Sequence, residues 1–241
     1  MKKLLLILLC LPMIGFGQFT MIPDANFEQK LINLGYDNGA INGSVYTAMI
    51  NTITSLDVEY SNISDLTGIE DFTALTYLNC NSNQLTSLDV SQNTALTYLY
   101  CYSNQLTSLD VSQNTALIDL NCHINQITSL DVSANTALIN LYCLLNQLTS
   151  LDVSGATALT TLWCWDNQLT SLDVSQNTAL YRLNCNSNQL TSLDVSQNTA
   201  LTYLYCNSNQ LTSLDVRNGN NTNMVYFDSE SNPSLSCINV D

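Results

Sequence analysis

The sequence predicts a β-rich solenoid, in which a short unit repeats along the chain and each copy forms one coil of a stack. The first observation is the repeat itself: the string LTYLNCNSNQLTSLDVSQNTA begins at Leu75, and further copies begin at the leucines numbered 96, 117, 138, 159, 180 and 201. The second is an alternation of apolar and polar residues within each copy, which is typical of a strand with one buried side. Because a unit of 21 residues leaves no room for a full α-helix, we expect coils of short strands and turns.

The first half of each copy matches the leucine-rich-repeat pattern, with cysteine in place of the usual third leucine. In the first copy, Leu78 and Cys80 point to the inside of the coil. The outward side of the same strand is formed by Tyr77, Asn79 and Asn81. The pattern therefore predicts a main parallel sheet built from residues 78–80 and the equivalent positions of the other copies.

The second half of each copy repeats this alternation, with Leu88 and Val90 inward and Ser87, Asp89 and Ser91 outward. It predicts short strands or isolated bridges at residues 88–90 and their equivalents. Between the two halves the chain turns at an asparagine, whose inward amide is expected to satisfy the backbone groups of the turn. These asparagines are at positions 83, 104, 125, 146, 167, 188 and 209.

The stack requires caps, because the burial of about six apolar side chains, at roughly 1.5–3 kcal/mol each, cannot offset the ordering of one coil alone. Residues 53–74 are expected to form a first coil with inward side chains at Leu56, Val58, Ile63 and Leu66. Before it, Pro23-Asp24 is expected to start a short helix that Gly35 ends and that closes this coil. One face of that helix holds Phe27, Leu31 and Leu34.

The last residues form a degenerate copy of the unit. Its first half aligns with residues 75, 78, 80 and 83 through Met224, Phe227, Ser229 and Asn232. Its second half, after one inserted residue, aligns with residues 85, 88 and 90 through Leu235, Ile238 and Val240. Two interpretations stay open: residues 211–241 are a terminal cap, or the chain is a fragment of a longer protein.

The start of the chain predicts a signal peptide at residues 1–17, with a basic start at Lys2 and Lys3 and an apolar core at residues 4–16. That core is shorter than the roughly 20 residues of a membrane span, so no transmembrane segment is expected in the mature chain. We expect a secreted or cell-surface protein, with the periplasm as the alternative. The predicted domains are an N-terminal cap at 18–52, the repeats at 53–221 and a degenerate C-terminal repeat or cap at 222–241.

Composition excludes several function classes. Twenty acidic residues against five basic ones give a formal net charge of −15, which repels nucleic acid and anionic lipid. The single histidine, His123, leaves general acid–base catalysis and most zinc sites without their commonest residue. His123 beside Asp119 and Asn121 is the one candidate catalytic group, and it has no distinct nucleophile nearby, so no enzyme is predicted.

The repeats and the opening Ile22-Pro23-Asp24-Ala25-Asn26-Phe27 together resemble secreted bacterial leucine-rich-repeat proteins of the internalin-like type, over about residues 22–241. The segment Asn-Gln-Leu-Thr-Ser-Leu-Asp-Val resembles the repeats of a Gram-negative subgroup of these proteins. The resemblance implies the α/β horseshoe class of leucine-rich-repeat solenoid, a curved right-handed superhelix that binds partners, often proteins, on its concave sheet. Members of the subgroup commonly have a C-terminal sorting or anchoring module, and none is recognisable here.

The outward positions of the first strand vary among the copies, and they hold both tryptophans and seven of the twelve tyrosines. Rigid amphipathic rings that face water are typical of interfaces and carbohydrate-binding surfaces. A mere strand preference of aromatic residues would place rings in both halves of the coil, but the Leu-Thr-Ser-Leu-Asp-Val segments have none. We therefore predict an extracellular protein or carbohydrate as the partner, bound by Tyr98, Tyr100, Tyr102, Asp119, His123, Tyr142, Leu144, Trp163, Trp165, Tyr203 and Tyr205.

Two further columns suggest other chemistry. The inward cysteines 80, 101, 122, 143, 164, 185 and 206 are predicted to be buried thiols rather than disulfides or metal ligands, whereas Cys237 lies outside this column and is a candidate for an intermolecular bond. A column of aspartates puts like charges on successive coils, which is expected to raise their pKa values or to recruit cations such as calcium. The alternative is a solvated, self-repelling ridge, and no metal or cofactor is predicted. The column comprises Asp57, Asp89, Asp110, Asp131, Asp152, Asp173, Asp194 and Asp215.

Two function classes therefore stay open. One is a recognition module that binds a protein or glycan through the aromatic side of the sheet. The other is a structural or adhesive surface protein that acts by self-association.

Overall fold

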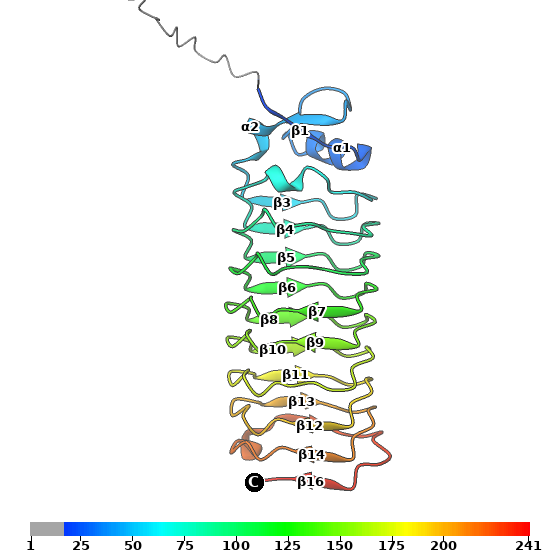
Figure 1. Cartoon of the computed structure of the whole chain (residues 1–241), viewed down its shortest axis with the longest axis vertical. Helices are drawn as coiled ribbons and strands as arrows, with labels where there is room; N and C mark the ends of the chain where they lie inside the picture. The colour runs from blue at the N-terminus through cyan, green and yellow to red at the C-terminus, as the bar shows by residue number, and fades with distance from the viewer. Residues whose placement is uncertain (1–16) are drawn as a thin grey trace, which may run out of the picture.

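The computed structural model describes residues 17–241, which form a stack of coils (Figure 1). The predicted signal peptide, except for Gly17, lies outside the described residues. Each coil adds one strand to a nine-stranded parallel sheet. Its strands are β3 (Ser55–Asp57), β4 (Tyr77–Asn79), β5 (Tyr98–Tyr100), β6 (Asp119–Asn121), β8 (Asn140–Tyr142), β10 (Thr161–Trp163), β11 (Arg182–Asn184), β13 (Tyr203–Tyr205) and β15 (Tyr226–Asp228).

The strands of this sheet pair without any shift, so that Leu78 lies beside Leu99 and each later core leucine beside its equivalent. The Cys80 N–H donates to the Tyr100 carbonyl oxygen at 2.8 Å, which extends the ladder one residue beyond β4. The predicted strand at residues 78–80 is confirmed, with a start one residue earlier. We call the outward side of this nine-stranded sheet the aromatic face.

The second half of each coil forms shorter ladders. They comprise β7 (Ser129–Asp131) with β9 (Ser150–Asp152), an isolated bridge between Asp89 and Asp110, and the sheet of β12 (Ser192–Asp194), β14 (Ser213–Asp215) and β16 (Cys237–Asn239). The expected mixture of strands and bridges is confirmed. We call the outward side of these segments the aspartate face. Asp57 does not belong to it, because Asp57 lies in β3 and pairs with Asn79 on the aromatic face, so that part of the predicted column is wrong.

One apolar core runs along the stack between the two faces. The seven cysteines of the inward column are buried and free, which confirms the prediction of buried thiols. Cys164, Cys185 and Cys206 also donate through Sγ to a carbonyl oxygen of the next coil, at 3.4–3.6 Å. The column therefore fills space and adds weak hydrogen bonds between coils.

The asparagine satisfies backbone groups of the turn, as predicted, and it also links neighbouring coils. Asn104 Nδ2 donates to the carbonyl oxygens of Cys80 and Cys101, both at 3.0 Å, and Asn104 Oδ1 accepts from Leu85 N at 3.0 Å. A second asparagine column, which sequence reasoning missed, does the same at the other turn: Asn114 Nδ2 donates to Val90 O at 2.9 Å. Its fully buried members are at positions 93, 114, 135, 177 and 198, and Ala156 replaces the asparagine in the fourth copy.

The N-terminal cap consists of the antiparallel strands β1 (Phe19–Met21) and β2 (Ser44–Tyr46), helix α1 (Ala25–Asn33) and the short helix α2 (Thr47–Ile50). Asp24 caps α1 through Oδ1, and its Oδ2 accepts from Ser64 N at 2.8 Å, which ties the cap to the first coil. Phe27 of α1 stacks on Phe72, whose centroid is 6.3 Å away, just after the 3₁₀ helix η1 (Ile69–Asp71). The predicted helix is confirmed, but Leu34 is not part of its buried face, since it follows the last helical turn and is 39% exposed.

The degenerate copy at the C-terminal end continues both ladders after the 3₁₀ helix η2 (Asn221–Asn223). Phe227 pairs with Leu204 and Ile238 with Leu214, which confirms the alignment of the two halves. Figure 1 shows the coils stacked in a nearly straight column, so the curvature implied by the resemblance is slight in this view. A nearly straight stack is expected where both sides of the coil are strand-like and equally spaced. None of the helices within residues 17–241 is long and apolar enough to cross a membrane.

Candidate binding face

Every predicted binding residue lies on the aromatic face, in three columns. The first residue of each strand forms the first column, which includes Tyr98, Asp119 and Tyr203. The third residue of each strand forms the second column, which includes Tyr100, Tyr142, Trp163 and Tyr205. Two positions beyond it lies the third column, with Tyr102, His123, Leu144 and Trp165. The regular ladder holds equivalent side chains at about 4.8 Å intervals.

The rings pack against one another across neighbouring coils. Tyr77 meets Tyr100 edge to face, with centroids 5.6 Å apart and an interplanar angle of 86°. Tyr142 meets Trp163 in the same way, at 5.3 Å and 87°. Such contacts orient the rings, so the face presents fixed aromatic groups rather than freely rotating ones.

Between these two ring pairs lie Asp119 and His123, two of the predicted binding residues. Asp119 is half-buried and its Oδ2 accepts from Asn140 Nδ2 at 2.9 Å. Burial raises the pKa of Asp119, and its hydrogen bond with Asn140 opposes that change without cancelling it. His123 hydrogen-bonds to Asn121 through Nδ1 and stacks on Tyr102 at 4.4 Å, and burial lowers the pKa of its imidazole. This part of the face thus combines a desolvated carboxylate with an imidazole that favours its neutral form.

Several outward positions are less exposed than alternation alone suggests. The expectation that Leu144 adds to the exposed surface is wrong: it is 7% exposed, because its column places it between the larger side chains of His123 and Trp165. Asn79 and Asn81 are buried as well, and both donate to Glu59 Oε2, at 3.1 and 2.9 Å. Trp163 at 37% and Tyr98 at 38% are the most exposed rings among the predicted residues.

Sequence reasoning missed a group at the C-terminal half of this face. The Arg182 guanidinium lies over the rings of Tyr203 and Tyr181, at 4.7 and 5.5 Å from their centroids. Tyr205 stacks on Tyr226 at 4.4 Å. Tyr226 could have been found, because aligning Phe227 with Leu78 places Tyr226 in the Tyr77 column. Tyr181 precedes its strand in a column of threonines and isoleucines, and no pattern indicated it.

The aspartate face behaves differently from the prediction. Asp89, Asp110, Asp152 and Asp173 have lowered pKa values, so the expectation of raised values is wrong for them. Each carboxylate accepts from the backbone N–H two residues later, for example Asp110 Oδ1 from Ser112 N at 2.9 Å. This hydrogen bond favours the charged form more strongly than the neighbouring, well-solvated carboxylate opposes it.

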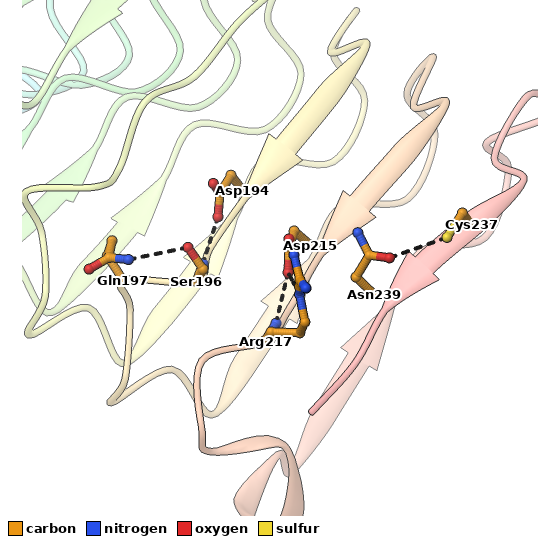
Figure 2. Close-up of polar contacts among 7 residues, drawn as sticks. All are labelled: Asp194, Ser196, Gln197, Asp215, Arg217, Cys237 and Asn239. Atoms are coloured by element: carbon orange, nitrogen blue, oxygen red, sulfur yellow. Dashed lines mark hydrogen bonds and ion pairs between the residues drawn. The ribbon is translucent and has the colours of Figure 1, made fainter.

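The end of the aspartate face is shown in Figure 2, where Asp194 and Asp215 lie on neighbouring strands. Arg217 Nε donates to Asp215 Oδ1 at 3.0 Å and lowers the pKa of that carboxyl to about 2. Cys237 is exposed and its Sγ donates to Asn239 Oδ1 at 3.3 Å. Within residues 17–241, no three His, Cys, Asp or Glu side chains converge as ligands of a metal ion.

Known proteins support the fold. No family model matches the chain. Over 71 residues, 30% of this chain, the sequence is 46% identical to Internalin J of Listeria monocytogenes serotype 4b (strain F2365), and this segment spans 8% of that protein. A solved structure of the functional domain of InlJ from Listeria monocytogenes, which includes a cysteine ladder, is 37% identical and superposes with a TM-score of 0.63 over 93% of this chain and 62% of that one.

The chain is an internalin-like leucine-rich-repeat protein. The structure of internalin C2 from Listeria monocytogenes str. 4b F2365 has the same fold, with a TM-score of 0.67 at 19% identity over 92% of this chain and 95% of that one. The internalin-like chain spans less than two thirds of the length of Internalin J and of the InlJ domain.

Proposed function

We propose that this internalin-like protein is an exported bacterial recognition module, secreted or held at the cell surface, that binds a protein or glycan through its aromatic face. The observation that supports this most directly is the braced pair of Tyr142 and Trp163, which holds an exposed indole ring against a partly exposed phenol ring at a fixed angle. Rigid rings provide contact area at a low entropic cost, and binding energy in interfaces concentrates on such residues.

The difference between the faces supports the same proposal. Both are formed by the same coils, but the outward residues vary from coil to coil mainly on the aromatic face, and specificity requires a surface that differs locally. The centre of the proposed site lies in the second to fifth copies, at Tyr100, Tyr102, Tyr142, Trp163 and Trp165. Leu144 supports these residues from beneath rather than contacting the partner.

The test is capture of cell-surface proteins and immobilised glycans by the full chain, compared with two variants. Trp163→Ala with Trp165→Ala is expected to lose binding by about 2 kcal/mol or more, while thermal stability changes little. A control pair on the aspartate face, Asp131→Asn with Asp152→Asn, is expected to bind like the natural chain. Equal binding by the tryptophan variant would exclude this face, and concentration-dependent light scattering without any captured partner would favour self-association.

A further inference from the structure

The centre of the aromatic face has a carboxylate among aromatic rings. Asp119 lies in β6, next to Tyr98 of β5 in the first column. Tyr100 and Tyr142 lie on the coils on either side of Asp119. Burial raises the pKa values of both phenols, and the charge of Asp119 adds to that change. Three tyrosines from the two neighbouring coils therefore lie near one carboxylate.

A shorter side chain lies between Tyr100 and Tyr142 in the sheet. In the second column these two residues flank Asn121, so they are two coil steps apart, about 9.6 Å at the usual strand spacing. Asn121 is shorter than either ring and is engaged by His123. No aromatic ring therefore stands between Tyr100 and Tyr142 in this column.

Each of these two rings is held by an aromatic partner on its other side. Tyr77 packs edge to face on Tyr100, and Trp163 packs edge to face on Tyr142. Moving either ring toward Asn121 would break that contact. The two partly exposed rings therefore keep fixed orientations on either side of Asn121.

The Asp119 carboxylate has unused hydrogen-bonding capacity. Oδ2 accepts from Asn140, while Oδ1 accepts no hydrogen bond from any group within residues 17–241. A half-buried, incompletely bonded carboxylate gains from a cation, and tyrosine faces attract cations through their quadrupoles. Arg182, the cation of this face, lies three strands away from β6 in the sheet and stacks on Tyr203.

From these contacts we propose that Asp119 with Tyr98, Tyr100 and Tyr142 forms a subsite for an alkylammonium group, the side chain of a lysine on a protein partner. This rests on the proposed function and narrows it to a protein with an exposed lysine. A lysine has an apolar stem that aromatic rings can contact and one compact charge to meet the carboxylate. The net charge of −15 draws basic partners toward the chain without specifying where they bind.

The probe is a blocked tripeptide, acetyl-Gly-Lys-Gly-amide, titrated into the full isotope-labelled chain while backbone amide shifts are followed by NMR. Shifts are expected at Tyr98, Asp119, Asn121 and Tyr142. The peptides with Nε-acetyl-lysine or norleucine lack the charge and are expected to bind at least about tenfold more weakly. Equal binding by either of them would overturn the subsite, as would shifts confined to the aspartate face.

Two matched pairs of variants distinguish the effect of the Asp119 site on peptide binding from the effect of the overall negative charge. Asp119→Asn keeps the shape and is expected to weaken the lysine peptide about tenfold, whereas Asp131→Asn removes the same charge from the aspartate face and is expected to change binding less than twofold. Tyr142→Leu is expected to weaken binding, and Tyr46→Leu, in β2 of the N-terminal cap, is expected to leave it unchanged. If a captured partner depends on Trp163 and Trp165 but not on Asp119, the subsite is wrong while the proposed function stands; if it depends on none of them, both fail.

Discussion

The aromatic face and the aspartate face lie on the same coils, and the difference between them separates what repetition does for folding from what it does for binding. On the aspartate face the outward residues hardly vary, and each carboxylate is used within its own coil, as Asp152 is by the N–H of Ser154. On the aromatic face the outward residues differ among coils, and they contact side chains of neighbouring coils, as Tyr142 does with Trp163. The constant columns therefore stabilise the repeated coil, and the variable columns create a surface that differs locally and could recognise a specific partner.

The largest effect is expected where one coil approaches another on the turn after the aspartate-face strand. A Cβ on Gly155 would lie 1.8 Å from the carbonyl oxygen of Ser133, so Gly155→Ala forces the backbones apart. We expect the free energy of unfolding to fall by about 3 kcal/mol, which is near the upper end of the range for overpacking substitutions. Urea unfolding provides the measurement.

The repeat supplies the control for this prediction. Gln176 occupies the same position one coil later, and Ala134 occupies it one coil earlier. Gln176→Ala is therefore expected to change stability by less than about 0.5 kcal/mol. If Gly155→Ala were equally mild, the close approach at the fourth copy would not be a real constraint on the stack.

Much of this fold was predictable because a fixed period and a two-residue alternation determine which side chains point inward. The register of β4 with β5, the buried cysteines and the amide of Asn104 all follow from that. What alternation cannot give is how far a neighbour covers an outward side chain, so Leu144 was placed on the surface and Tyr181 was overlooked. The pKa of Asp110 was misjudged for a related reason, since a hydrogen bond from Ser112 is a local turn contact that charge spacing does not predict.

An intermediate effect on stability is expected in the apolar core between the two faces, at the column of buried cysteines. Cys143 is fully buried, and burial raises its thiol pKa well above the ordinary value, so it stays a neutral packing group. Cys143→Ala leaves a small cavity and is expected to cost about 1–2 kcal/mol of unfolding free energy without preventing assembly of the stack. Cys237→Ala, at an exposed cysteine, is the control and is expected to be neutral. Disulfides between column cysteines, detected by mass spectrometry of the native protein, would contradict the assignment.

The smallest effects have opposite signs on the two faces. The pKa of Asp110 is lowered in the folded protein, so its stabilisation is present above the ordinary value of 3.8 and is lost as pH falls below it. Asp110→Ala is therefore expected to lower the free energy of unfolding by about 0.5 kcal/mol at pH 7, a value kept small because solvent screens this exposed carboxylate. The loss is expected to be smaller at pH 3. The pKa of Asp119 is raised, so folding disfavours its charged form, and its cost is relieved as pH falls through the raised value.

Asp119→Asn is accordingly expected to make the free protein slightly more stable at pH 7, by less than about 1 kcal/mol, and to lose that advantage toward pH 3. Thermal unfolding of both variants across this pH range provides the measurement. If Asp119→Asn both stabilises the protein and weakens binding of the lysine peptide, Asp119 lowers stability but contributes to binding. That combination indicates a residue kept for function, because a group kept only for packing would not lower stability. Destabilisation by Asp119→Asn at neutral pH would instead make Asp119 a structural partner of Asn140.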